Sequence, residues 1–202
     1  MVSSYCILFI IYFLLVRIEK CPLYFSSEAL LFQIWGGKPS TRMLRHRDAF
    51  DKAALIYRHR QLERLIPGLK LPNLEEEKAN SLEADQVYDR CIEFLRVRTR
   101  DKKRFPLVFE ENCNYGFRRN LWGMRRFGIV ISSLSFGAIG IVIALNYFNK
   151  ALPPLPMEIS CGSISLSLLL GWIIVFTPKW VRVPAEAYAQ RLLESFNSVD
   201  SG

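Results

Sequence analysis

The chain has 202 residues, of which half are hydrophobic and 23% are charged, and its formal net charge is +8 at pH 7. This length accommodates one modest domain together with a few membrane spans. The charges are unevenly spread, because residues 38–126 hold 21 Lys and Arg against 13 Asp and Glu, whereas residues 127–148 and 159–177 hold none. This segregation argues against a single mixed globule and favours a soluble part joined to a membrane part.

The cysteines and histidines do not form a recognisable metal-binding pattern. Five cysteines are scattered along the chain without a CxxC pair, and the only histidines are His46 and His59. No zinc-binding spacing results. We therefore predict no metal and no cofactor, and we expect reduced, structural thiols in a soluble part that faces the reducing, cytoplasmic side.

Residues 1–37 are predicted to form an N-terminal membrane anchor or interfacial segment. Residues 2–16 are apolar and uncharged, and positive charge comes only afterwards, at Arg17. A secretory signal has the opposite order and a small-residue cleavage site, so a retained anchor is favoured. Fifteen residues are short for a full span, which leaves an interfacial or buried helix as the alternative. We expect a short surface helix ending with Trp35, followed by a turn at Gly36–Gly37.

Residues 38–126 are predicted to form a basic, helical, cytoplasmic domain. Helices are expected to start near Ser40 or Thr41 and again near Asp48. Apolar residues recur at helical spacing after the second start, and Pro67–Gly68 is expected to end that helix.

The second half of this domain is expected to contain a connector, a long helix and a short helix that leads into the membrane. Residues 67–82 form the connector, and Asn80 with Glu83 resembles a capping box that opens a helix over Leu82–Arg100. The apolar face of that helix is expected to comprise Val87, Tyr88, Cys91, Ile92, Phe94 and Leu95. The arginines at its end suit the negative end of the helix dipole. The short helix is placed through Tyr115–Leu121.

Residues 127–177 are predicted to form a transmembrane helical hairpin. Each uncharged run is about 20 residues long, the length that an apolar helix needs to cross a bilayer. The prolines that separate the two runs are Pro153, Pro154 and Pro156. Lys and Arg flank both outer ends of the hairpin, which places those ends in the cytoplasm by the positive-inside rule. Residues 178–202 are expected to contain a C-terminal amphipathic helix that begins near Pro184.

Small residues at near-helical spacing mark one face of each predicted span. They are Ser133, Gly137, Gly140 and Ala144 in the first span and Ser163, Ser167 and Gly171 in the second. Such faces allow helices to approach closely in lipid. We favour a contact within the hairpin, and a homo-oligomer is the alternative. Neither span holds an ionisable residue, which argues against an ion-coupled transporter.

The richest candidate for a binding site lies just before the first span, in residues 112–123. Six polar, basic and aromatic residues within this segment and just after it are candidates for binding a lipid head group or another acidic ligand: Arg118, Arg119, Asn120, Trp122, Arg125 and Arg126. The simpler interpretation, which we favour, is a bend at the membrane surface, with arginines and aromatic residues at the interface and glycines for the bend.

No catalytic constellation is predicted. The letters HRD at residues 46–48 are those of a kinase catalytic loop, but that loop needs Asn where this chain has Ala53. Glu75, Glu76 and Glu77 are expected to be a solvated run. The general basic excess favours membrane lipid over nucleic acid as a partner.

Three segments together resemble a group of uncharacterised bacterial integral membrane proteins: Trp35–Pro39 with Leu44–Asp48, Ile66–Gly68 with Pro72 and Glu75–Glu77, and Tyr115–Gly123. The resemblance covers about residues 30–177. It implies a membrane hairpin, a helical cytoplasmic domain and a second hairpin, and it implies no activity. Residues 1–34 are short and broken for a full first hairpin, which leaves two or three spans.

The predicted fold is therefore mainly α, an integral membrane protein with a transmembrane hairpin and a small basic helical domain. The leading hypothesis is a multi-pass protein of the bacterial inner membrane whose cytoplasmic domain senses or docks a protein partner, as a scaffold or effector. The alternatives are a membrane-bound enzyme acting on an anionic lipid or nucleotide, and a pore-forming oligomer.

Overall fold

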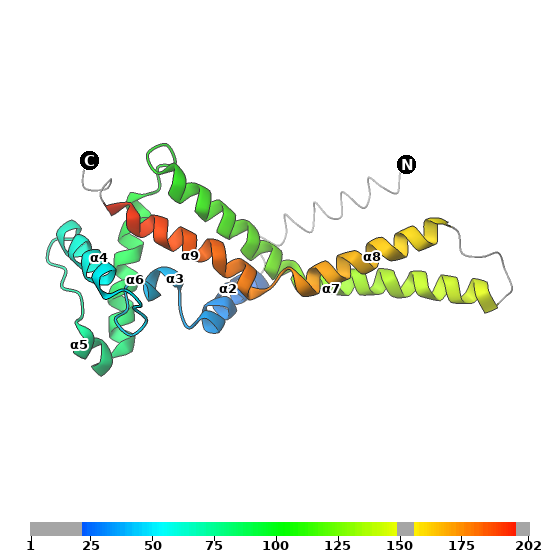
Figure 1. Ribbon diagram of the computed structural model, residues 1–202, viewed down its shortest axis with the longest axis horizontal. Coiled ribbons are helices and arrows are strands. Elements are labelled where there is room, and N and C mark those ends of the chain that lie inside the picture. The colour runs from blue at the N-terminus through cyan, green and yellow to red at the C-terminus, as the bar shows by residue number, and fades with distance from the viewer. Residues whose placement is uncertain (1–21, 149–155, 197–202) are drawn as a thin grey trace. The chain divides into compact units, whose positions relative to one another are not determined.

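The computed structural model describes residues 22–148 and 156–196, and these residues are mainly helical, with no strand among them (Figure 1). The prediction of a mainly α fold is confirmed. Eight helices are described: α2 (Pro22–Trp35), α3 (Pro39–Arg42), α4 (Lys52–Leu65), α5 (Leu74–Ala79), α6 (Ser81–Arg98), α7 (Pro106–Phe148), α8 (Pro156–Ile174) and α9 (Pro178–Glu194). The predicted anchor at residues 2–16 lies outside the described residues.

The described chain divides into two compact units, which we name the helical unit and the hairpin unit. The helical unit contains Glu28–Phe117 and α9 from Arg182 onward. The hairpin unit contains Arg118–Val181 and the first residues of α2. These boundaries differ from the predicted ones, because α2, α7 and α9 each contribute residues to both units.

The core of the helical unit is built on α6. Tyr88, Cys91, Ile92 and Leu95 recur at helical spacing and are buried together. They pack with Leu62 of α4, with Phe105 and Val108 at and just before the start of α7, and with Leu192 and Phe196 at and just after the end of α9. The predicted apolar face of this helix is confirmed, with Val87 and Phe94 packed at its edges. Each fully buried aliphatic side chain contributes about 1.5–3 kcal/mol.

Several helix starts differ from the sequence predictions for identifiable reasons. The hydroxyl of Thr41 caps no helix, because α3 starts at Pro39. Asp48 does not start α4 either, since its carboxylate binds arginines, and Asp51 is the cap, accepting from the N–H groups of Ala53 and Ala54.

The predicted connector at residues 67–82 contains a helix, α5. Asn73 and Glu76 form the capping box at its start, with each side chain bound to the other residue's backbone N–H. Asn80 caps α6 as predicted, accepting from the N–H of Glu83 at 3.2 Å. The helix before the connector ends at Leu65, and Gly68 then adopts a φ of 77° that favours glycine.

Two further corrections concern the chain on either side of the hairpin. The short helix and the bend expected over residues 112–123 do not form, because α7 is one helix of 43 residues from Pro106 to Phe148. The last helix starts at Pro178 rather than near Pro184, which lies inside α9. The hydroxyl of Thr177 assists that start by accepting from the N–H of Trp180 at 3.3 Å.

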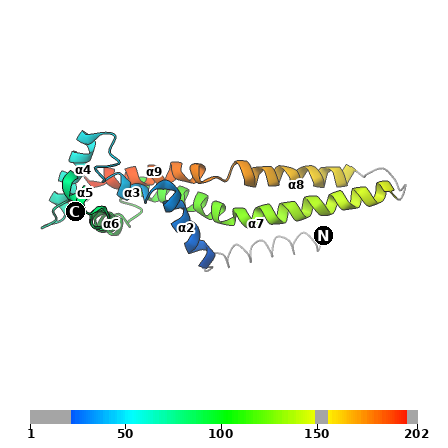
Figure 2. The same ribbon diagram turned by 90° about the horizontal axis from the view of Figure 1, so that it is seen from below.

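In the hairpin unit, α7 and α8 run antiparallel and side by side (Figures 1 and 2). Both helices are long and apolar enough to cross a membrane. Their tight contact lies at Gly128, where a Cβ atom would overlap the indole ring of Trp172. A Cβ atom at Gly137, Gly140 or Gly171 would meet nothing within 4 Å.

The small residues singled out in the sequence are therefore not the close-packed positions of the hairpin. The serines and alanine among them, Ser133, Ala144, Ser163 and Ser167, are exposed. Gly128 was not predicted from the sequence, because its contact with Trp172 joins one residue of each helix and leaves no repeated spacing of small residues.

We predict that Gly128→Ala destabilises the hairpin by about 1–3 kcal/mol, because the added methyl group forces the Trp172 ring or the helices to move. Tryptophan fluorescence during SDS titration of the full chain in mixed micelles measures the effect. Gly137→Ala is the matched control and is expected to change the midpoint little. Equal midpoints for the two variants would contradict the packing at Gly128.

Candidate functional site

The segment that joins α3 to α4 is held to α6 by an ionic network, and Arg45 is its centre. The Arg45 guanidinium, 9% exposed, donates two parallel hydrogen bonds to the Asp85 carboxylate, each 2.8 Å long. It also donates to the carbonyl of Gly36 at 2.8 Å. Gly37 has a φ of 129°, and a Cβ atom there would contact the same guanidinium. The glycine pair thus makes room for Arg45.

Glu77 is the most deeply buried charged group of the network, with 1% of its surface exposed. Its carboxylate accepts from the backbone N–H of His46 at 2.7 Å and of Arg47 at 3.2 Å. It also accepts from the hydroxyl of Tyr88 at 2.9 Å and from the Arg47 guanidinium at 3.0 Å. Burial alone would raise the pKa of Glu77, but these four donors outweigh burial and lower it.

The expectation that Glu75, Glu76 and Glu77 form a solvated run is therefore wrong for Glu77. Glu75 and Glu76 are exposed, whereas Glu77 lies on the opposite face of α5 and points into the helical unit. The acceptor role of Glu77 depends on contacts 11 to 31 residues away in sequence, which no local pattern reveals.

The remaining basic residues of the segment are also paired. Lys38 binds Asp89 at 2.6 Å, and the hydroxyl of Thr41 donates to the other oxygen of that carboxylate. Arg42 binds Asp48 at 3.1 Å, and Arg47 binds Asp85 in addition to Glu77. The basic residues between 38 and 47 are thus neutralised internally, so their charge is engaged in folding.

The two histidines lie against this network. The Nε2–H of His59 donates to the carbonyl of Leu44 at 2.8 Å, and that of His46 donates to the carbonyl of Pro72 at 3.2 Å. The two rings meet edge to face with centroids 5.0 Å apart. Burial lowers the pKa of His59, and this effect outweighs the hydrogen bond to Leu44 and the nearby carboxylates of Glu63 and Glu77, which raise it.

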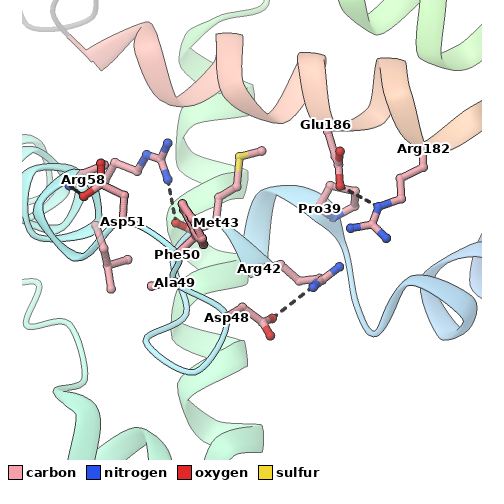
Figure 3. Close-up of a pocket in the computed structure, with 12 residues that line it drawn as sticks. Pro39, Arg42, Met43, Asp48, Ala49, Phe50, Asp51, Arg58, Arg182 and Glu186 are labelled. Carbon is pink, nitrogen blue, oxygen red and sulfur yellow. Dashed lines mark hydrogen bonds and ion pairs between the residues drawn. The ribbon is translucent and has the colours of Figure 1, made fainter. Parts of the chain in front are cut away.

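A groove of about 390 Å³ opens beside the network (Figure 3). Its lining comes from the α3–α4 segment, the first half of α4 and the start of α9: Pro39, Arg42, Met43, Asp48, Ala49, Phe50, Asp51, Ala54, Leu55, Arg58, Arg182 and Glu186. Each arginine already has a partner, the carboxylate of Asp48, the carbonyl of Met43 or the carboxylate of Glu186. The Phe50 side chain is fully exposed. The three carboxylates of the lining, Asp48, Asp51 and Glu186, are engaged in ion pairs with Arg42 and Arg182 or in the cap of α4.

The arginines predicted to bind a lipid head group have structural partners in the hairpin unit. The Arg125 guanidinium donates to the carbonyls of Trp172 at 2.9 Å and Ile173 at 3.1 Å. These carbonyls belong to the last turn of α8. The carbonyls in the last turn of a helix receive no hydrogen bond from an N–H of the same helix. Arg125 thus completes the C-terminal end of that helix.

Arg118 has an equivalent role at α9. Pro184 has no N–H, so the carbonyl of Trp180, four residues earlier, loses its helical donor. The Arg118 guanidinium donates to that carbonyl at 3.1 Å and lies 4.8 Å from the centre of the Trp180 ring. The other predicted site residues are Arg119, Asn120 and Trp122, which are half-buried, and Arg126, which is exposed.

Within residues 22–148 and 156–196, no group of three His, Cys, Asp or Glu side chains is placed to hold a metal ion. Burial raises the pKa of Cys91 to about 11, so this thiol is not poised to act as a nucleophile. Cys113 and Cys161 are exposed and unbridged.

Comparisons of the chain with protein-family models, with curated proteins and with solved structures found no match.

We predict that Glu77→Gln destabilises the helical unit by about 2–3 kcal/mol at pH 7, because the buried donors lose their negative acceptor. Urea unfolding of the full chain in mild detergent, followed by circular dichroism, measures the loss. The exposed neighbour Glu75→Gln is the matched control. Because the folded-state pKa of Glu77 is lowered, its contribution is complete above the unfolded pKa of about 4.3 and is lost as pH falls through the folded value. An equal loss of unfolding free energy in Glu77→Gln and Glu75→Gln would contradict the stabilising role of Glu77 in the network.

We also predict that the helical unit loses stability between pH 7 and pH 5.5. Burial lowers the folded-state pKa of His59 below its unfolded value of about 6.5, so the unfolded chain takes up more of the proton and stability falls as pH decreases. His59→Gln keeps an N–H for the carbonyl of Leu44 and has no such proton to gain. The same urea experiment at the two pH values should show a smaller pH effect in this variant, and an undiminished effect would assign the titration to another group.

Proposed function

We propose that the chain is an integral membrane protein in which α7 and α8 cross the bilayer and the helical unit is a non-enzymatic docking module for a partner in the cytoplasm. The observation that carries this proposal is the exposure of large apolar side chains around both helices of the hairpin. These exposed residues include Ile131, Leu134, Ile141, Leu145, Ile164, Leu168 and Ile174.

An apolar surface of this kind needs a cover. A helix that is apolar on all sides is buried in a protein core or in a membrane. Hardly any residue of the apolar windows of α7 and α8 is buried within the chain. Acyl chains supply a cover that matches both the length and the chemistry of the hairpin.

The polar groups of α8 fit the same environment. The hydroxyls of Ser160, Ser163 and Ser167 each donate to the carbonyl four residues earlier in their own helix, at 2.8–2.9 Å. Within a bilayer, polar groups have to be satisfied inside the protein. A pore needs polar side chains that face a channel, so these internal bonds favour an anchor over the pore-forming alternative.

Orientation follows from the basic residues next to the apolar runs. Arg125 and Arg126 precede the run in α7, and Lys179 and Arg182 follow the run in α8. The positive-inside rule assigns these ends to the cytoplasm. A bacterial inner membrane is the location implied by the family resemblance.

A docking role suits the helical unit better than an enzymatic one. Its buried charges are paired within the ionic network, and the carboxylates that line the groove beside that network are engaged in ion pairs or in the cap of α4. Phe50 at the groove is a large apolar side chain left entirely in solvent, and aromatic side chains are enriched at protein interfaces. The enzyme alternative depended on Arg118 and Arg119, and Arg118 serves the carbonyl of Trp180 instead.

Cysteine labelling tests the membrane topology. Variants that keep Cys113 or Cys161, with Cys6 and Cys21 replaced by Ser, are treated with a membrane-impermeant maleimide in right-side-out and inverted membrane vesicles. We predict that Cys113 reacts in inverted vesicles only. Cys161 is exposed on α8, so its protection has to come from lipid, and we predict that it reacts only after detergent is added.

Cys91 stays in all variants because it is buried, and a variant that keeps only Cys91 gives the background. Reaction of Cys161 without detergent would show that the hairpin does not lie in the bilayer. Reaction of Cys113 from outside would reverse the orientation.

A further inference from the structure

The densest run of basic residues in the helical unit lies where α6 ends and α7 begins. We name residues 96–104 the basic corner. Six of its nine residues are basic, namely Arg96, Arg98, Arg100, Lys102, Lys103 and Arg104, and one is acidic, Asp101. All six basic residues are exposed.

The basic corner differs from the ionic network in how its charges are compensated. In the network, every cation faces a carboxylate of another element. In the corner, Arg96 binds Glu93, one turn earlier on the same helix. Within residues 22–148 and 156–196, the side chains of Arg100, Lys102 and Lys103 have no carboxylate partner. The corner therefore presents net positive charge to solvent.

Helix electrostatics explain only part of this corner. Arg96 and Arg98 lie in the last turn of α6, where cations stabilise the helix. Lys102, Lys103 and Arg104 immediately precede α7, whose first turn holds no acidic residue. Cations beside a helix N-terminus are unfavourable, so helix electrostatics give no reason for Lys102 and Lys103, whereas Arg104 packs on the ring of Phe105. Positive charges that do not stabilise the fold indicate that a ligand outside the chain binds them.

A groove of about 250 Å³ lies beside the corner and narrows the choice of ligand. Its lining holds the cations Arg96 and Arg100, the carboxylate Glu93, which is paired with Arg96, and the rings of Phe109 and Tyr188. The Arg100 guanidinium thus leaves the charge of the lining positive. Phe109 is about half exposed. Charge complementarity thus calls for carboxylates next to an apolar side chain that enters the groove.

We propose that the basic corner and this groove bind an acidic segment of a partner protein, in which carboxylates flank an apolar side chain. A flat bilayer surface does not fill a groove. Successive bases of a nucleic acid stack on a row of open aromatic faces. Here the Arg98 guanidinium covers the ring of Phe94 and that of Arg104 covers the ring of Phe105, which leaves the half-exposed ring of Phe109 without an open aromatic neighbour among these three. The inference names the partner class for the docking role proposed above.

Fluorescence polarisation of the full chain in phosphatidylcholine nanodiscs tests this binding. The probe is a fluorescein-labelled peptide of twelve residues with two Glu for each Leu, and a Glu and Ser peptide of equal charge is compared with it. We expect the Leu peptide to bind at least about fivefold more tightly. Arg100→Ala, Lys102→Ala and Lys103→Ala together should weaken that binding about tenfold, because three surface charges are removed.

The matched control is Lys52→Ala, Arg60→Ala and Arg64→Ala, which removes the same charge from exposed positions of α4. We expect less than a twofold change for this triple variant. Phe109→Ala should reduce the Leu peptide to the affinity of the Ser peptide while circular dichroism of the chain stays unchanged. Equal losses in the two triple variants would reduce the effect to general charge and overturn the proposal.

Two other ligands decide the partner class. Tighter binding of a 20-nucleotide single strand, or of vesicles containing phosphatidylglycerol, with the same dependence on Arg100, Lys102 and Lys103 would also overturn it. Peptide binding is measured independently of the labelling of Cys161. The proposed docking surface and the proposed membrane hairpin can thus be contradicted independently of each other.

Discussion

The helical unit depends on one buried carboxylate. A charge with 1% exposure is costly to remove from water, and Glu77 is tolerated because four donors surround it. Those donors come from the α3–α4 segment and from α6, so a single side chain on the six-residue helix α5 connects three parts of the chain. Arg47 extends the connection to Asp85, and Asp85 extends it to Arg45. The position of the segment, and with it one wall of the groove at Phe50, follows from this chain of ion pairs.

The arginines of the chain perform three different tasks that composition alone does not separate. In the ionic network they neutralise buried or half-buried carboxylates. At the hairpin unit, Arg118 and Arg125 supply donors to carbonyls that a helix end or a proline has deprived of theirs. In the basic corner, Arg100 and its neighbours face solvent. The formal charge of +8 is therefore not spread evenly over the surface. The positive charge that a partner can contact is concentrated in regions such as the basic corner.

Periodic features of the fold were predictable from sequence, and features that depend on distant partners were not. The buried face of α6 and the apolar hairpin follow from side-chain spacing and run length, which are local properties. Glu77 looked like its exposed neighbours because its burial depends on Tyr88 and Arg47. The glycines of residues 112–123 suggested a bend, yet helical hydrogen bonding continues through α7. The groove at Phe50 was the feature least predictable from the sequence, because its lining comes from three separated segments.

The proline inside α9 has an evolutionary consequence. Pro184 removes the N–H that would bind the carbonyl of Trp180, and Arg118 provides the replacement from 62 residues away in sequence. A residue with an N–H at position 184 would compete for the same carbonyl oxygen, and loss of the arginine while proline remains would leave that oxygen without its donor. Positions 118 and 184 are thus joined through a third residue, and substitutions at one change what is tolerated at the other. Divergent copies of this chain should vary at the two positions together.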